Sequence, residues 1–186
     1  MRLFVALDLD DAAREALKSE QRRLASRLGD RISLKWVRQD QAHLTLTFLG
    51  EVPDATAASL VDAFSRALPI APFDVTFDRV GIFPPRGEPR ILWVGAGAGA
   101  ADVSRVNGEC ALRIRRLGLA VEDRPFHPHV TLGRFRAGHR GEVERAIDGE
   151  ARRPIATVHI DHATLYQSRL SSAGPSYVAL AHATLT

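Results

Sequence analysis

Hydrophobic residues recur along this chain at two spacings, and each spacing predicts a different kind of element. Apolar positions three or four residues apart predict four helices, over 11–28, 57–68, 103–117 and 143–147. Asp10 or Asp11 caps the first helix and Gly29 ends it, whereas Pro69 ends the second. The glycine and alanine stretch over 95–101 is interpreted as a linker. Alternating or short continuous apolar runs predict strands over 3–7, 34–37, 43–48, 73–77, 91–94, 129–132, 155–160, 163–167 and 177–181.

Two of these strand segments carry the same motif, His-x-Thr-Leu, at 43–46 and at 129–132. Side chains two positions apart in a strand point to one face, about 6.6 Å from each other. Each segment therefore displays an imidazole and a hydroxyl together: His43 with Thr45, and His129 with Thr131. The intervening side chains point to the opposite face and are expected in the core: Leu44, Leu46, Phe48, Val130 and Leu132.

The motif belongs to a longer internal repeat. A shift of 86 positions (129 minus 43) superposes the two motifs, and it also superposes Pro89 on Pro175. The order strand, helix, strand, strand follows each histidine. The repeat predicts an α+β fold in which residues 1–186 form a single domain of two pseudo-symmetric lobes. Each lobe is expected to be an antiparallel sheet with helices on the outside, and the histidines are expected to meet in a central cleft.

Paired imidazoles are suited to acid and base catalysis. The unperturbed pKa of histidine lies near neutrality, so one ring can donate a proton while a second, neutral ring accepts one. Threonine hydroxyls can donate hydrogen bonds to phosphate oxygens, and an arginine can balance the charge that grows at phosphorus. This chemistry requires neither a metal ion nor another cofactor.

Composition narrows the class of protein. The 186 residues are 45% hydrophobic, which is ordinary for a globular protein with a sizeable core. No apolar stretch approaches the roughly 18 residues of a membrane span, so we expect a cytoplasmic monomer without a membrane partner. Cys110 is the only cysteine and is expected to be a core thiol. The net charge of +3 comes almost entirely from arginine and favours a phosphate-bearing ligand.

Four blocks of the sequence resemble one known family. The blocks are 35–37 leading into 43–50, 89–94, 128–134, and 165–168 followed by 174–177, and together they cover nearly the whole chain. They are similar to the two-histidine phosphoesterase superfamily, and within it to the RNA 2′,3′-cyclic phosphodiesterases formerly called 2′-5′ RNA ligases. The resemblance implies a bilobal α+β fold with two antiparallel sheets lining a cleft.

The resemblance also implies a reaction and roles for individual residues. The expected reaction is hydrolysis of a 2′,3′-cyclic phosphate at an RNA end, or of a small cyclic nucleotide, to a 2′-phosphate. His43 is the expected proton donor and His129 the proton acceptor, with the roles exchanged if the reaction runs backwards to a 2′-5′ linkage. Thr45 and Thr131 are expected to hold the phosphate. Arg134 is a further phosphate-binding candidate, but it reaches the histidine face only if its strand ends or bulges.

Other interpretations of the same residues remain open. The cleft could bind a nucleotide or an RNA end without turnover, or His127 and His129 could share a metal ion. Phe126, just before the second motif, is the first candidate for stacking on a nucleobase, ahead of Trp36, Trp93 and Tyr177. His159 and His162 flank Asp161 in what we interpret as a surface cluster, and His139 and His182 belong to no pattern.

Overall fold

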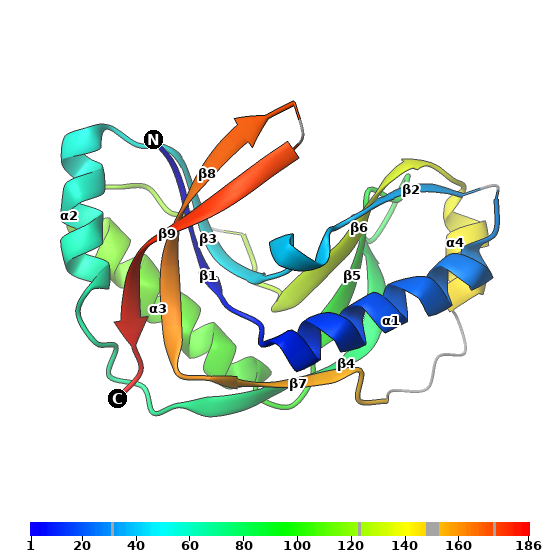
Figure 1. Cartoon of the computed structure of the whole chain (residues 1–186), viewed down its shortest axis with the longest axis horizontal. Coiled ribbons are helices and arrows are strands. Elements are labelled where there is room, and N and C mark those ends of the chain that lie inside the picture. The colour runs from blue at the N-terminus through cyan, green and yellow to red at the C-terminus, as the bar shows by residue number, and fades with distance from the viewer. Residues whose placement is uncertain (31, 123, 148–152, 173) are drawn as a thin grey trace.

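The computed structural model describes residues 1–30, 32–122, 124–147, 153–172 and 174–186 (Figure 1). Its strands are β1 (Arg2–Leu7), β2 (Ser33–Trp36), β3 (Leu44–Glu51), β4 (Phe73–Phe83), β5 (Ile91–Ala96), β6 (His129–Ala137), β7 (Ala156–Ile160), β8 (His162–Ser171) and β9 (Gly174–Thr184). Its helices are α1 (Asp11–Leu28), α2 (Asp54–Phe64), α3 (Ala100–Arg116) and α4 (Arg140–Ile147), with one 3-10 turn, η1 (Gln39–Gln41). The predicted α+β class is confirmed.

Within the described ranges, nine strands form one antiparallel sheet. Eight of them lie in the order β7-β4-β5-β6-β3-β1-β8-β9, and β2 pairs with β6 between Gly133 and Ala137. At the centre of this order β3 and β6 are joined by a single residue pair, Leu44 with Val130. The narrow junction divides the sheet into two parts. We call β3, β1, β8 and β9 the His43 half, and β6, β2, β5, β4 and β7 the His129 half.

The chain crosses between the halves repeatedly. The β4–β5 pair follows β3 along the chain but joins the His129 half, whereas the β8–β9 pair follows β6 and joins the His43 half. The helices pack as follows: α2 contacts β8 and β9 of the His43 half, α1 contacts α4 and β7 of the His129 half, and α3 contacts a strand of each half, β3 and β4 (Figure 1). Each half is therefore assembled from segments of both ends of the sequence.

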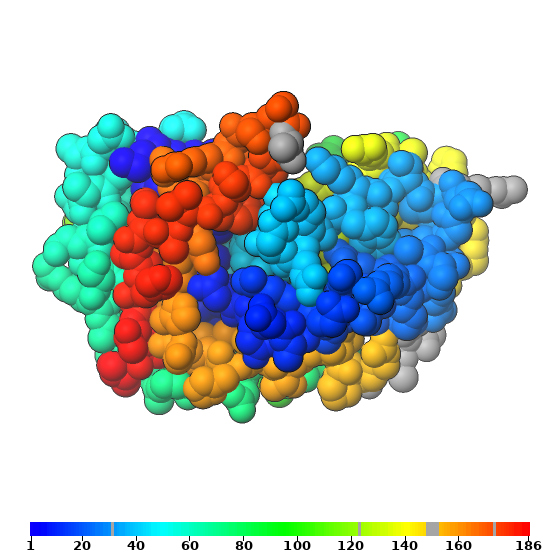
Figure 2. All heavy atoms as spheres, in the orientation of Figure 1, coloured from blue at the N-terminus to red at the C-terminus, as the bar shows by residue number. Residues whose placement is uncertain are grey.

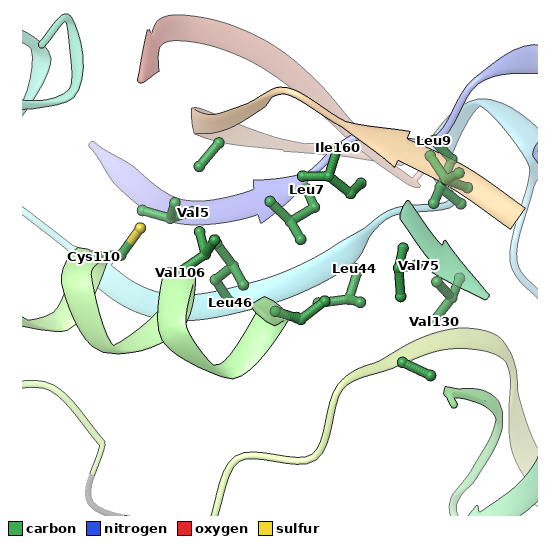
Figure 3. Close-up of a cluster of buried hydrophobic side chains, with 14 of the residues drawn as sticks. Val5, Leu7, Leu9, Leu44, Leu46, Val75, Val106, Cys110, Val130 and Ile160 are labelled. Carbon is green, nitrogen blue, oxygen red and sulfur yellow. The ribbon is translucent and has the colours of Figure 1, made fainter. Parts of the chain in front are cut away.

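The residues at the junction belong to the hydrophobic core. Leu44 and Val130 are buried, and Figure 3 shows them in a cluster that continues to Leu46 and to the α3 side chains. Cys110 on α3 is fully buried in this cluster, and burial raises the pKa of its thiol to about 12. Its burial confirms the prediction of a core thiol. A thiol with this pKa stays protonated at neutral pH.

The predicted ends of the first helix are confirmed, and those of the second are not. The Asp10 carboxylate accepts a hydrogen bond from the backbone N–H of Ala13 at 2.7 Å, and Gly29 takes the positive φ of 69° that ends α1. The prediction that the second helix continues to residue 68 is wrong, because α2 ends at Phe64. Leu68 instead forms a bridge to Leu185 beside the end of β9.

The interpretation of 95–101 as a linker is also wrong. This stretch comprises the end of β5, a tight turn and the first residues of α3. Gly99 has a φ of 80°, and a Cβ atom there would lie 2.3 Å from the backbone oxygen of Asp74. The glycines therefore allow close contact with β4. None of the described helices combines the length and the apolar character needed to cross a membrane.

Candidate active site

β3 and β6 show the same succession of buried and exposed residues. Over Leu44–Glu51 and over 130–137 the alternation is interrupted by two consecutive buried residues, after which an exposed one follows. A bulge in each strand is the cause. The register of β3 with β1 passes from Thr45 to Thr47, and that of β6 with β5 passes from Thr131 to Gly133. The extra residues, Leu46 and Leu132, are equivalent in the 86-residue repeat.

The bulge at Leu132 changes the face to which Arg134 points. On a regular strand Arg134 would lie opposite to His129, but one extra residue restores it to the face of His129 and Thr131. The bulge that the phosphate-binding hypothesis for Arg134 requires is thus present. Gly133 allows it to be compact, because a Cβ atom there would lie 2.8 Å from the Leu34 side chain on β2.

The bulge at Leu46 has the same effect on Phe48, which occupies the position equivalent to Arg134. The expectation that Phe48 belongs to the core is wrong, since its side chain is 60% exposed. Thr47 takes the buried position instead, and its hydroxyl accepts a hydrogen bond from the Asn107 side chain at 3.3 Å. The other expected core residues of the two motifs are buried: Leu44, Leu46, Val130 and Leu132.

The junction brings the two motifs together. Continuing the Leu44–Val130 register by one residue on each side sets His43 opposite Thr131 and Thr45 opposite His129. The two histidines are then diagonal neighbours, and such residues lie about 7–8 Å apart in a regular antiparallel pair, with their Cβ atoms somewhat closer. All four side chains are partly buried and share the face opposite to the core residues. Figure 2 shows a recess on this part of the molecule, between the red and orange β8–β9 segment and the light-blue η1.

Both histidines are held in the same way by the backbone that precedes them. Nδ1 of His43 donates to the carbonyl oxygen of Gln41 at 2.8 Å, and Nδ1 of His129 donates to that of His127 at 2.6 Å. A carbonyl oxygen only accepts, so Nδ1 carries the proton in both rings. Nε2 is left in each case as the nitrogen that can exchange a proton with a ligand.

The electrostatic surroundings of the two rings differ. Burial is the largest influence on both and lowers the pKa of each, and the charge of Arg134 lowers both further. The guanidinium is therefore within electrostatic reach of both imidazoles. On His43 the Asp8 carboxylate raises the pKa and the Arg14 guanidinium lowers it, whereas on His129 positive charge on His127 lowers the pKa.

Aromatic rings surround both histidines. The His43 ring lies 5.0 Å from Phe4 and 5.2 Å from Tyr177, measured between ring centroids. The His129 ring lies 5.1 Å from Phe83 and 6.2 Å from Trp93. Tyr177 and Trp93, two of the stacking candidates, thus contact the histidines, while Trp36 and Phe126 pack against the core. Base stacking by Phe126 stays a prediction.

Potential metal ligands gather at a different place from the one considered in the sequence. In the part of the chain that the structure describes, the group of three potential ligands is Asp8, His162 and His182. Neither His127 nor His129 belongs to it. Sequence reasoning assigned His162 to a surface cluster and His182 to no pattern, because the strands that bring them together are remote from β1 along the chain.

The profile of the LigT like phosphoesterase family matches residues 7–93 and 98–177, which include both histidine motifs. The chain belongs to this family. Among curated relatives of this LigT like phosphoesterase is an RNA 2′,3′-cyclic phosphodiesterase from Archaeoglobus fulgidus, 32% identical over 95% of this chain and 96% of the relative. Another, of the same name, is from Thermotoga maritima and is 29% identical over 97% and 93%.

Solved structures extend the similarity to the fold of this LigT like phosphoesterase. A protein of Thermus thermophilus superposes with a TM-score of 0.79 at 28% identity, covering 99% of this chain and 97% of the other. LigT of E. coli in its apo form gives 0.77 at 26% identity, covering 100% and 97%. The same E. coli protein in complex with 3′-AMP gives 0.75, covering 100% and 98%.

The face that bears the histidines also includes residues that sequence reasoning did not single out. The sequence predicts only a strand position for Phe4 and a core position for Phe48. The repeat itself carried the signal for Phe48, since a shift of 86 positions superposes it on Arg134. No comparable signal marks Phe4, because its position beside His43 depends on the pairing of β1 with β3.

Proposed function

We propose that this protein hydrolyses 2′,3′-cyclic phosphate ends of RNA and leaves a 2′-phosphate and a 3′-hydroxyl. The observation that carries the proposal is that His43 and His129 meet at one junction in the same arrangement, each with Nδ1–H on a carbonyl and with Nε2 not hydrogen-bonded to any residue that the structure describes. Membership of the LigT like family supports it, as do relatives named RNA 2′,3′-cyclic phosphodiesterases. A small cyclic nucleotide is a substrate of the same chemistry.

The proposed step is a displacement at phosphorus assisted by both imidazoles. Nε2 of His129 accepts a proton from water as the water oxygen bonds to phosphorus. The bond from phosphorus to the 3′ oxygen breaks, and Nε2–H of His43 donates its proton to that oxygen. One proton enters and one leaves the histidine pair in each turnover, so the step uses no metal ion.

The charges near the two rings support this division of roles. An acid must be protonated before it donates, and the Asp8 carboxylate favours the protonated form of His43, against burial and the positive charges of Arg14 and Arg134, which lower its pKa. A base must be neutral, and positive charge on Arg134 and His127 adds to burial in favouring neutral His129. In the reverse direction the same groups with exchanged roles would form a 2′-5′ linkage, although water at its usual concentration favours hydrolysis.

The remaining candidates act on the phosphate itself. Thr45 and Thr131 share the histidine face and can donate their hydroxyl protons to non-bridging oxygens. Arg134, returned to that face by the bulge, can balance the charge that grows as phosphorus becomes five-coordinate. We assign all three to phosphate binding, with Arg134 contributing most in the transition state.

The test is an RNA oligonucleotide that ends in a 2′,3′-cyclic phosphate. We expect hydrolysis in the presence of EDTA, with the product phosphate on the 2′ oxygen as located by ³¹P NMR. His159→Ala is the matched control, because His159 is an exposed histidine on β7 that pairs with Asp74 at 2.7 Å away from the junction. A protein that binds a 2′-phosphorylated nucleotide yet never hydrolyses the cyclic form would be a binding module, and the proposal would be wrong.

A further inference from the structure

A second polar cluster lies in the His43 half, where the end of β1 meets β8 and β9. It contains Asp8, His162 and His182, and one ligand atom of each lies within 4.8 Å of those of the other two. We propose that these three residues form a binding site for a zinc ion, with a fourth position open to water. Neither His43 nor His129 belongs to the site, so zinc binding can be measured separately from hydrolysis, although the Asp8 carboxylate also acts on the pKa of His43.

Each candidate ligand is oriented by a second polar group. Nδ1 of His162 donates to the Asp161 carboxylate at 2.5 Å, and its Nε2 donates to the Asp8 carboxylate at 3.1 Å, so a zinc ion would replace the Nε2 proton between these two side chains. The Thr164 hydroxyl lies 2.6 Å from the Asp8 carboxylate and 2.9 Å from Nδ1 of His182. Histidines that bind metals commonly hold their second nitrogen on a carboxylate, as His162 does on Asp161.

A further hydrogen bond fixes the carboxylate and relates the cluster to the histidine face. The Tyr166 hydroxyl donates to the second oxygen of Asp8 at 2.5 Å. The Tyr166 ring stacks on Phe4 at 5.3 Å, and Phe4 in turn contacts His43. The cluster thus lies on the same side of the sheet as His43, beyond the Phe4 ring, and Asp8 is held on both oxygens before any ion binds.

The donor set and its exposure favour zinc. Two imidazole nitrogens and one carboxylate oxygen are a common protein ligand set for Zn²⁺ when water completes the tetrahedron. The Asp8 side chain is 24% exposed and that of His162 33% exposed, so an ion can enter from solvent. An ion pair holds Asp8 beside His162, and His182 contacts both the Thr164 hydroxyl at 2.9 Å and the His162 ring at 5.1 Å between centroids, so a third nitrogen ligand stands beside the pair.

Calorimetric titration of chelator-treated protein with Zn²⁺ tests the site. We expect one equivalent to bind, and Co²⁺ in its place to give the visible absorption of a four-coordinate ion. His182→Ala should weaken zinc binding at least about tenfold, because it removes a ligand from an exposed position on β9. His159→Ala, which alters a histidine paired with a single carboxylate, should bind zinc like the original protein.

Two further variants keep the result interpretable. Asp161→Asn retains all three ligands but alters the group behind His162, and we expect about a 10–100-fold weaker affinity, the usual range for such partners. The double variant His43→Gln, His129→Gln should keep the full stoichiometry. The proposal is overturned if the original protein does not bind zinc, if His182→Ala binds it unchanged, or if the double variant loses it. Hydrolytic activity plays no part in any of these measurements.

Discussion

The two halves of the sheet share one backbone feature, a bulged strand, but present chemically different side chains on it. Both place a histidine and a threonine before a bulged leucine, and both expose the second residue after that leucine. In the His43 half the exposed residue is Phe48, and in the His129 half it is Arg134. The backbone therefore determines where a side chain is presented, and the residue at that position determines whether the half offers an aromatic ring or a charge.

A second difference lies two residues before each histidine. Gln41 and His127 are equivalent, and the carbonyl oxygen of each accepts the Nδ1 proton of the histidine that follows. The Gln41 side chain also donates to the carbonyl oxygen of Pro175 at 2.6 Å, which ties η1 to β9. His127 brings an ionisable ring to the corresponding place. The two catalytic candidates thus have equal backbone support but unequal charge around them.

Removing either imidazole should have the largest effect. His43→Ala and His129→Ala should each lower kcat by at least about 10²-fold, the scale of general acid or base catalysis. The residual activities should differ in pH dependence: loss of the base removes the acidic limb of the profile, and loss of the acid removes the basic limb. Profiles that lose the same limb in both variants would contradict the assigned roles.

Removing the Arg134 guanidinium of the His129 half should have the next largest effect on hydrolysis. Arg134→Ala should lower kcat/KM about 10–100-fold, since a hydrogen bond to a charged group contributes roughly 1.5–3 kcal/mol. Arg134→Lys should recover part of the loss. Arg105→Ala, which removes an arginine paired with Asp102 on α3, should have no effect on hydrolysis. An equal loss in the Arg105 variant would show that net charge, rather than position, accounts for the result.

Removing the Phe48 ring of the His43 half should change KM more than kcat. Phe48→Ala should raise KM for an RNA end by about tenfold, because stacking on an aromatic side chain contributes roughly 1–3 kcal/mol per base. Its kcat should stay unchanged, and the free energy of unfolding should change by less than about 0.5 kcal/mol because the side chain is exposed. Leu170→Ala, at an equally exposed apolar residue of β8, is the control. A fall in kcat like that of Arg134→Ala would contradict the distinction between the halves.

The smallest expected effect comes from giving both halves the same residue two positions before the histidine. His127→Gln places in the His129 half the residue that the His43 half has at Gln41, and it leaves the backbone carbonyl in place. Positive charge on His127 lowers the pKa of His129, so its removal should raise that pKa. The base is active when neutral, so the acidic limb of kcat/KM should move to higher pH, by less than about one unit. The basic limb, which belongs to His43, should stay where it is.

Most of the elements and the two motifs were accessible from alternation and helical spacing alone. The bulges were not, because Leu46 and Leu132 are apolar residues in apolar runs, and nothing in the pattern distinguishes an extra residue from a regular one. Phe48 was misplaced for this reason. From the sequence, Arg134 could be placed on the histidine face only if its strand bulges. The structure shows that bulge in β6.

The group of Asp8, His162 and His182 was inaccessible for a different reason. Asp8 directly follows β1, whereas His162 and His182 lie on β8 and β9, and the order in which these strands lie side by side is a property of the folded sheet. Neither spacing nor composition relates residue 8 to residues 162 and 182. The same holds for Tyr177 beside His43, since the β8–β9 pair lies in the half opposite to β6 and β7, which precede it along the chain.

Because the chain crosses between the halves, fragments of the protein should not fold on their own. A single cleavage after β5 would leave β1 and β3 without β8 and β9, and β4 and β5 without β6 and β7. Neither piece would retain a complete half, although each would carry one histidine motif. The two pieces would therefore have to associate to regain the fold, and co-expression should restore what separate expression does not.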